Sequence, residues 1–306
     1  MDMNQNSVLT CSLGVFAYNE AGNITALLEA LCSQKLSRTR IAEIIVVSSA
    51  STDGTDELVQ DFALTHPQVR LIRQASREGK SSAINLFLAE AKSEILVVIS
   101  GDVIPAENTI ERLVSAFADP RVGATGGRPV PVNDPHTFMG YAVHMLWRLH
   151  HRMALISPKL GEMIAFRKVL DSIPADSAVD EASIEAIVRA KDLKLRYLPE
   201  AIIHNKGPEN LRDFIKQRRR IQNGHLWLMK KQGYRVVSQN SGTLLWILLQ
   251  EIREYPLATA RVVAVMALEM YCRLLGSIDF HIKGKNPFAW DIAQSAKNLK
   301  APTGKK

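Results

Sequence analysis

One segment of the chain reads Ile95-Leu96-Val97-Val98-Ile99-Ser100-Gly101-Asp102. Its run of apolar, mostly β-branched residues predicts a strand that is covered on both faces, as in a parallel sheet. Asp102 follows at the carboxyl end of that strand, and open α/β sheets bind their ligands at this edge. A carboxylate there can hold a divalent cation, and the cation can hold a diphosphate.

Working outward from this strand, the first part of the chain alternates strand and helix patterns. Four or five such units in succession predict an α/β fold with a mostly parallel sheet, right-handed crossovers and helices on both faces. After Asp102, Pro105 and Glu107 favour the start of a helix. The predicted strands of this part are 8–17, 43–48, 69–73, 95–99 and 122–126, and its predicted helices end near residues 34, 65, 91 and 117.

The second part has a different pattern, in which longer helices predominate. Two of its segments, 243–250 and 257–278, are strongly apolar. A membrane span needs about 20 mostly uncharged residues, and the first segment is too short while the second contains Arg261, Glu269 and Arg273. We expect these segments to form helices that pack on the protein or lie at a membrane surface. The other predicted elements are helices at 138–155, 180–190 and 211–232 and strands at 161–167 and 195–204.

Positive charge is concentrated in one segment. The chain has 306 residues and a net charge of +7, and residues 205–235 contain nine Lys or Arg against two acidic residues, a difference of seven. Such a segment suits an anionic partner, which could be a substrate phosphate, a lipid surface or nucleic acid. The alternative is a solvated helix face. The segment lacks interleaved aromatic residues and any recognised module, so we do not expect nucleic-acid binding.

The cysteines and the start of the chain indicate the compartment. Cys11, Cys32 and Cys272 are far apart and odd in number, which argues against a disulfide framework or a zinc cluster and favours a reducing cytosol. Residues 1–10 are polar and do not resemble a secretory signal.

Polar residues recur where the predicted strands end. They occupy residues 18–20, 48–53, 77–80 and 100–102, so that turn residues, a lysine and a carboxylate would meet at one rim of the sheet. No Gly-x-Gly-x-x-Gly follows the first strand, which argues against a dinucleotide enzyme. The P-loop pattern Gly-x-x-x-x-Gly-Lys-Ser/Thr is also missing from the sequence.

Six motifs, in order along residues 8–233, resemble those of the family-2 glycosyltransferases, which have the GT-A fold. They are Ala17-Tyr18-Asn19-Glu20, Ser48-Ser49-Ala50-Ser51-Thr52-Asp53-Gly54-Thr55, Gly79-Lys80-Ser81-Ser82-Ala83-Ile84-Asn85, Ser100-Gly101-Asp102 in place of the metal-binding Asp-x-Asp, Asp180-Glu181 in place of the Glu-Asp pair, and Gln217-Arg218-Arg219-Arg220-Ile221 in place of Gln-x-x-Arg-Trp.

The resemblance implies a role for each motif. Glu181 corresponds to the catalytic base, assisted or replaced by Asp180, and Gly161 and Glu162 lie on the acceptor side. Asp102 would hold Mg²⁺ or Mn²⁺, with His204 as a further metal ligand or a diphosphate contact. The implied nucleotide- and diphosphate-binding residues are Ala17, Tyr18, Asn19, Glu20, Ser48, Ser49, Asp53, Lys80, Gly101, Asp102, Gln217 and Arg220.

Plainer structural roles stay open for several of these residues. Asp53 also suits a helix cap, and Asp180 and Glu181 suit the amino end of a helix. His204 is equally compatible with a satisfied polar residue. On the helix of residues 211–232, Arg218 and Arg219 could face lipid headgroups while Arg220 faces the site, since neighbours on a helix point in different directions.

The sequence departs from the family pattern in four places. Ser48 and Ser49 replace acids, one of which commonly contacts the nucleotide base in this family, so uridine is only the default nucleoside of the donor. Ser100 replaces the first acid of Asp-x-Asp, the acids at 180–181 are in reversed order, and Ile221 replaces a tryptophan of the processive members.

The resemblance thus implies an inverting, metal-dependent glycosyltransferase. Its donor would be a nucleotide-diphospho-sugar, and its acceptor a hydroxyl or phosphate group on a glycan or lipid. Residues 1–235 would form the GT-A domain, and residues 236–306 an apolar helical segment with a mobile tail. We expect a cytoplasmic protein associated with the anionic cytoplasmic face of a membrane. Because acids are lost at 48, 49 and 100, a non-catalytic nucleotide-binding or scaffold protein is the alternative.

Overall fold

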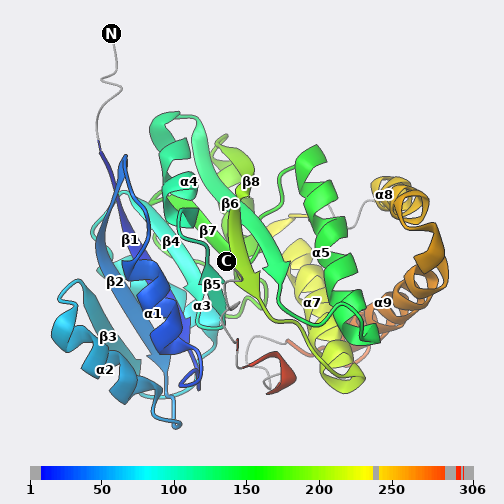
Figure 1. The fold of residues 1–306 in the computed structure, drawn as a ribbon, viewed down its shortest axis with the longest axis horizontal. Coiled ribbons are helices and arrows are strands. Elements are labelled where there is room, and N and C mark those ends of the chain that lie inside the picture. Colours follow the sequence, from blue (N-terminus) through cyan, green and yellow to red (C-terminus); the bar gives the residue numbers. More distant parts are fainter. Residues whose placement is uncertain (1–7, 237–240, 287–293, 298, 300–306) are drawn as a thin grey trace.

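The computed structural model describes residues 8–236, 241–286, 294–297 and 299. A single eight-stranded mixed sheet runs through the described part of the chain in the order β3-β2-β1-β4-β7-β6-β8-β5 (Figure 1). Its strands are β1 (Leu9–Ala17), β2 (Thr39–Ser49), β3 (Val69–Gln74), β4 (Ile95–Ser100), β5 (Val103–Pro105), β6 (Val122–Pro131), β7 (Met163–Arg167) and β8 (Lys194–Asn205).

The first half of the sheet is parallel, as the sequence predicts. Strands β3, β2, β1 and β4 pair in parallel, and β1 and β4 run in register from Cys11 opposite Ile95 to Phe16 opposite Ser100. Residues 95–99 are each at most 3% exposed, because helices cover both faces of the sheet. Apolar burial on this scale is the main stabilising contribution to such a fold.

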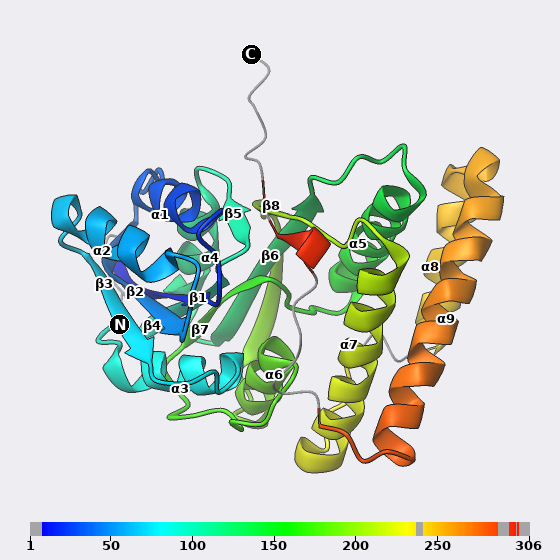
Figure 2. The same ribbon diagram turned by 90° about the horizontal axis from the view of Figure 1, so that it is seen from below.

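Helices lie on both faces of the sheet, which confirms the predicted layering. Helices α1, α2 and α4 lie on one face of the sheet and α3 and α6 on the other (Figure 2). The apolar side chains of each group share a buried cluster with the strands. The helices are α1 (Ile24–Cys32), α2 (Thr55–Thr65), α3 (Lys80–Glu90), α4 (Thr109–Ser115), α5 (Phe138–Ile156), α6 (Asp180–Ala190), α7 (Leu211–Gln232), α8 (Ser241–Glu254) and α9 (Thr259–His281).

The second half of the sheet is mixed. Strand β7 runs antiparallel to both β4 and β6, and the short β5 runs antiparallel to β8. The helix start predicted near Pro105 is wrong, because residues 103–105 form β5 and α4 begins only at Thr109. The β-branched Val103 and Ile104 suit a strand, and proline is tolerated in a strand at the edge of a sheet.

Helices α8 and α9 pack beside α5 and α7 around a separate apolar cluster (Figures 1 and 2). At Gly276 of α9 a Cβ atom would lie 2.6 Å from the carbonyl oxygen of Arg219, so only glycine permits this approach to α7. Two arginines of α7 for which the sequence left a lipid-facing orientation open are engaged within the protein instead. Arg218 is paired with Glu269 and Arg219 with Asp279, both on α9.

Within the described ranges, no helix combines the length and the apolarity needed to cross a bilayer. Of the expected tail, residues 287–293, 298 and 300–306 lie outside the described residues. A short 3₁₀ turn, Gln294–Ala296, returns this end of the chain to the sheet.

Candidate active site

A pocket of about 490 Å³ opens where the carboxyl ends of β1 and β4 face α6 and α7. Most of the residues that the sequence singles out line it, although they come from seven separate segments. Those that line it are Ala17, Tyr18, Glu20, Ser49, Lys80, Gly101, Asp102, Gly161, Glu162, Asp180, Glu181, Gln217 and Arg220.

Asp102 is half-buried directly after β4 and lines this pocket. The preceding Gly101 packs tightly: a Cβ atom there would lie 2.8 Å from Cγ of Glu20 and 3.1 Å from the carbonyl oxygen of Phe16. The Gly101 amide also donates a hydrogen bond of 2.9 Å to that oxygen. Glycine is therefore required for the chain to pass close to β1 and bring Asp102 to the rim.

Three predicted nucleotide-binding residues are not among the residues that line the pocket. Asn19, with φ of 53°, accepts a hydrogen bond from the amide of Thr52, and Ser48 is fully buried. Asp53 accepts hydrogen bonds from the amides of Ala21 and Thr55. The side chains of Asn19 and Asp53 thus fasten the loop after β1 to the loop after β2.

The loop after β1 is also held from the other end of the chain. Lys297 donates hydrogen bonds to the carbonyl oxygen of Tyr18 at 2.6 Å and to a carboxylate oxygen of Glu20 at 2.7 Å. Burial and the charge of Asp102 raise the pKa of Glu20 to about 7, against the lowering effect of Lys297. Arg77 stacks over the ring of Tyr18 at 4.1 Å, which gives this side of the pocket a flat cationic wall.

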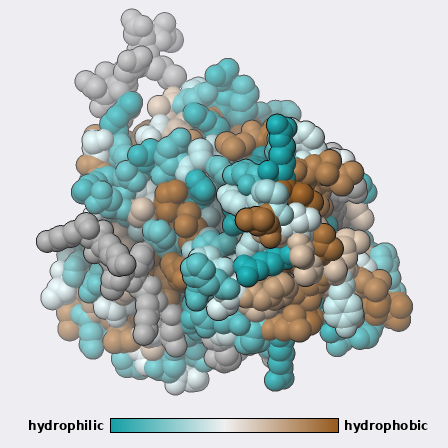
Figure 3. Space-filling model, turned by 45° about the vertical axis from the view of Figure 1, so that its right-hand side comes forward, coloured by the Kyte–Doolittle hydropathy of each residue, from teal (hydrophilic) through white to brown (hydrophobic). Residues whose placement is uncertain are grey.

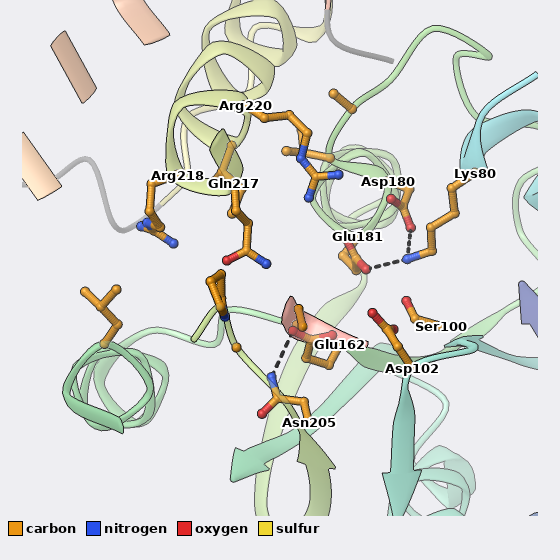
Figure 4. A pocket seen from close by; sticks show the side chains of 18 of the residues that line it. Lys80, Ser100, Asp102, Glu162, Asp180, Glu181, Asn205, Gln217, Arg218 and Arg220 are labelled. Atoms are coloured by element: carbon orange, nitrogen blue, oxygen red, sulfur yellow. Dashed lines mark hydrogen bonds and ion pairs between the residues drawn. The ribbon is translucent and has the colours of Figure 1, made fainter. Parts of the chain in front are cut away.

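Lys80 joins two helix starts inside the pocket. Its ammonium lies 2.8 Å from Asp180 and 2.9 Å from Glu181, the first two residues of α6 (Figure 4). Burial alone would lower the pKa of Lys80, but the two carboxylates raise it. Burial raises the pKa of Asp180, and the charge of Glu181 raises it as well. For Glu181 the effect of Lys80 outweighs that of burial, so its pKa is lowered. Glu181 is therefore held ionised.

Glu162 lies in the middle of the pocket and receives a hydrogen bond of 3.1 Å from Asn205 (Figure 4). Burial and the charge of Asp102 raise its pKa to about 7. Its φ of 32° is unusual for a residue with a side chain, and such strain concentrates at functional sites. The sequence suggested its place on the acceptor side but not this titration near neutrality.

The pocket does not include His204 among its lining residues, but it includes the next residue, Asn205. Successive side chains of a strand point to opposite faces, so β8 turns Asn205 to the site and His204 away from it. The expectation that His204 binds a metal is therefore corrected, and Asn205 takes its place as the polar residue at this point.

Asp102 and Asn205 line the same pocket, and each carries an oxygen of the kind that binds a divalent cation. Oδ1 of Asn205 is buried and has no hydrogen-bond donor among the described residues, while its amide nitrogen is used by Glu162. A carboxylate and an amide oxygen are hard ligands of the kind that Mg²⁺ and Mn²⁺ prefer. The described residues contain no cluster of three acidic, histidine or cysteine ligands, so a bound diphosphate and water would complete the coordination.

Helix α7 contributes fixed positive charge. Gln217 and Arg220 are three residues apart on one face of the helix and both point into the pocket (Figure 4). Burial lowers the pKa of Arg220 to about 10, while the carboxylates of Asp180 and Glu181 oppose that shift. Arg220 therefore remains charged at neutral pH and faces the acidic side of the site.

The pocket extends beyond these residues into a part that the sequence did not reveal. Lys159, Arg218, His225, Glu269 and Arg273 line its inner end, together with apolar side chains from α5, α8 and α9. These residues are dispersed over more than a third of the chain, and of them only Arg218 belongs to one of the six motifs. Only the basic character of α7 hinted at them.

Comparisons with known proteins agree with this arrangement. Residues 12–187 match the family described as Glycosyl transferase family 2. Among curated relatives, a probable glycosyltransferase YdaM of Bacillus subtilis is 25% identical over 74% of this chain and 58% of its own length. The beta-monoglucosyldiacylglycerol synthase of Synechocystis sp. is 30% identical over 53% of this chain and 36% of its own length. The chain thus spans less than two thirds of either relative.

One solved structure covers nearly the whole chain. The mannosyltransferase PcManGT of Pyrobaculum calidifontis, in complex with GDP-Man and Mn²⁺, superposes with a TM-score of 0.62 and 23% identity over 92% of this chain and 88% of its own. This likeness, together with the sheet and helix order, confirms the α/β fold of GT-A type predicted from the sequence.

Proposed function

This chain belongs to glycosyl transferase family 2, and we propose that it transfers a sugar from a nucleotide-diphospho-sugar to a hydroxyl or phosphate group of an acceptor. The transfer would invert the anomeric carbon and depend on a divalent cation. One observation carries the proposal above the others. A single pocket brings together Asp102, the Lys80 ion-pair cluster and Arg220, which are far apart in the sequence.

The chemistry needs a base, a sink for negative charge and an in-line geometry. Glu181 accepts the proton of an acceptor hydroxyl, and Asp180 helps to hold Lys80 in place. Arg220 and Lys80 supply fixed positive charge as the diphosphate departs, where charge that is already oriented needs little reorganisation. Both are partly buried in the pocket wall, so water screens their effect less than at the open surface.

A divalent cation would be held by the carboxylate of Asp102, which lines the pocket at the carboxyl end of β4. When bound, it would polarise the phosphoryl oxygens of the leaving group. The structural relative PcManGT was solved with Mn²⁺ and GDP-Man, which supports a divalent cation and a nucleotide-sugar donor for this chain as well. The nucleotide base remains uridine by default, as the family resemblance implies.

We also propose that the protein works at the cytoplasmic face of a membrane on a lipid or glycan acceptor. Helices α8 and α9 expose Trp246, Leu249, Met270 and Leu274 to solvent. Figure 3, in which this side comes forward, shows hydrophobic residues interspersed with hydrophilic ones. Such a surface suits shallow contact with a lipid interface. The name of the Synechocystis relative, a glycolipid synthase, points the same way.

The test is a transfer assay in which nucleoside diphosphate release is measured from a panel of UDP- and GDP-sugars with Mn²⁺ and a membrane lipid extract. We expect release that depends on the extract and falls at least 100-fold in Glu181→Gln. Loss of a general base typically costs about 10²–10⁴-fold in rate. Ser76→Ala, an exposed substitution outside the pocket, is the matched control.

Two results would contradict the proposal. Nucleotide binding without release of product from any donor would favour the non-catalytic alternative, particularly if Glu181→Gln left that binding unchanged. Transfer with retention of the anomeric configuration, read by proton NMR of the product, would exclude the inverting mechanism.

A further inference from the structure

A segment near the end of the sequence forms a strap across one side of the pocket. We use this name for residues 294–297 and 299, of which Ala296 and Lys297 line the pocket. In Figure 2 the red turn at the start of the strap lies between the sheet and α7. The strap thus contacts two elements that the proposed transfer uses, the loop after β1 and helix α7.

Lys297 fastens the strap to the loop after β1. Its ammonium donates hydrogen bonds to the carbonyl oxygens of Tyr18 and Asn19 and to Oε1 of Glu20, which together use all three of its protons. The backbone of Asn19 has a φ of 53°, which is costly for a residue with a side chain and persists only where its surroundings hold it. The contacts of Lys297 therefore help to hold this strained loop, which presents Tyr18 to the pocket.

A second contact of the strap reinforces the first. The amide of Leu299 donates a hydrogen bond of 2.7 Å to Oδ1 of Asn23. The amide nitrogen of the Asn23 side chain in turn donates one of 2.8 Å to Oε2 of Glu20. Lys297 and Leu299 thus reach the two carboxylate oxygens of Glu20 by separate routes, so the strap fixes this carboxylate on both sides.

Glu20 connects the strap to the end of β4 where the cation would bind. Its side chain lies so close to Gly101 that a Cβ atom there would be 2.8 Å from Cγ of Glu20, and Asp102 is the next residue. The side chains of Lys297 and Glu20 are only 14% and 8% exposed. Removing one partner of such a buried pair leaves the other uncompensated. Loss of the Lys297 ammonium would therefore disturb Glu20 beside the residue proposed to bind the cation.

The strap is anchored on its other side to the first turn of α7. Ser295 donates hydrogen bonds to Asp213 from its amide at 3.0 Å and from its hydroxyl at 2.6 Å, and it accepts one of 3.2 Å from the amide of Glu209. Asp213 lies about one turn before Gln217 and about two turns before Arg220, on the same face of the helix. Ser295 is not among the residues that line the pocket. A ligand in the pocket would therefore sense Ser295 only through the strap and α7.

We propose that Lys297 is a positioning residue for the donor: the strap seats on the arrangement of the β1 loop and α7 that binds the nucleoside diphosphate, and it holds the two together. This inference rests on the proposed function and adds a part of the donor site that lies outside residues 8–233, where the six motifs occur. Lys297 acts through Tyr18 and Glu20 and takes no part in bond making. Because coupling between two sites is mutual, a bound nucleotide must in turn hold the strap in place.

Calorimetric titration of the full chain with UDP and with GDP, each with Mn²⁺, tests the inference. For the nucleotide that binds, Lys297→Met should weaken binding about tenfold, within the range of about 5–150-fold that is typical of coupled sites. Lys297→Arg keeps the charge and should retain most of the affinity. Ser295→Ala, which changes no charge and lies outside the pocket, should weaken binding about fivefold. Lys285→Met, at an exposed lysine outside the pocket, is the control and should change nothing.

Two further measurements separate positioning from simple attraction of phosphate by a lysine. The double variant Lys297→Met with Ser295→Ala should bind no more weakly than Lys297→Met alone, because the effects of residues that act as one unit do not add. In the unmodified chain, hydrogen exchange of the Ser295 and Leu299 amides should slow about tenfold when nucleotide and Mn²⁺ saturate the protein. This exchange measurement needs no variant, so it tests the inference even where a variant does not fold.

The remaining outcomes each contradict a stated part. Unchanged affinity in Lys297→Met, or unchanged exchange of the two amides at saturation, would overturn the inference and leave the proposed donor intact. Weaker binding in Lys297→Met with unchanged binding in Ser295→Ala would make Lys297 a direct phosphate contact and overturn the role of the strap, as would additive losses in the double variant. Failure of both nucleotides to bind the unmodified chain would refute the proposed donor, and the inference with it.

Discussion

Replacing Lys80 by methionine should expose how strongly the active site depends on one cation. Its ammonium contacts Asp180 at 2.8 Å and Glu181 at 2.9 Å, and the three side chains are 18%, 4% and 24% exposed. Hydrogen bonds to charged groups contribute about 1.5–3 kcal/mol each. Removing one partner of a buried ion pair costs about 3–5 kcal/mol, because the other partner stays buried. Partial exposure favours the lower end, so we expect a loss of about 3 kcal/mol at pH 7.5.

The loss should depend on pH in a definite direction. In the unmodified chain the pKa of Glu181 lies below its ordinary value of 4.5. Ionised Glu181 therefore stabilises the fold at pH values above 4.5, and this stabilisation is lost as the pH falls through the lowered pKa. Without Lys80 both carboxyls would have raised pKa values and would destabilise the fold when ionised. Burial already raises the pKa of Asp180 in the unmodified chain, so ionised Asp180 destabilises the fold in both proteins. The stability difference should therefore shrink between pH 7 and pH 4.

Urea unfolding of both proteins, followed by circular dichroism at several pH values, measures this difference. Lys80→Arg keeps the charge and should lose less than half as much stability, while Lys92→Met, at an exposed lysine, should lose almost none. A loss below 1 kcal/mol, or one that is the same at pH 7.5 and pH 4, would refute the reasoning about the buried ion pairs.

Three further predictions follow from single contacts. Gly101→Ala places a Cβ atom 2.8 Å from Cγ of Glu20 and should cost about 1–3 kcal/mol in thermal or urea unfolding; an unchanged midpoint would contradict it. Lys297→Met should raise the pKa of Glu20 further above about 7, as read by carbon-13 NMR of the carboxyl group, and an unshifted titration would exclude the contact. Arg219→Met removes the pairing with Asp279 and should lower stability by about 1–2 kcal/mol while sugar transfer is retained; loss of transfer in a folded variant would contradict this purely structural role.

The sequence predicts the parallel half of the sheet well because the signals there are local. An apolar run ending at Asp102 predicts β4, and the bounds of α6 and α7 match the periodicity and the acidic or capping residues at their starts. The first turn of α6 begins with Asp180, as expected. The strand directions of β7 and β8 were not predicted, because pairing across a sheet depends on partners that are distant in the chain.

The misses in the site have the same physical origin. His204 and Asn205 are neighbours in the sequence, and a shift of the strand register by one residue decides which of the two side chains faces the pocket. The charged residues at the inner end of the pocket could not be predicted, because Lys159 and Arg273 come together only when α9 packs on α7. The neutral titration of Glu162 arises from burial and from the nearby Asp102, which composition does not reveal.

The central claim is that Asp102 binds a divalent cation that in turn binds a nucleoside diphosphate. Calorimetric titration of UDP and GDP, with and without Mn²⁺, tests it directly. The account predicts that Mn²⁺ tightens binding of at least one of them tenfold or more, about 1.4 kcal/mol, and that Asp102→Asn, still folded by circular dichroism, removes this gain. Equal affinity with and without Mn²⁺, or a gain that survives in Asp102→Asn, would contradict it.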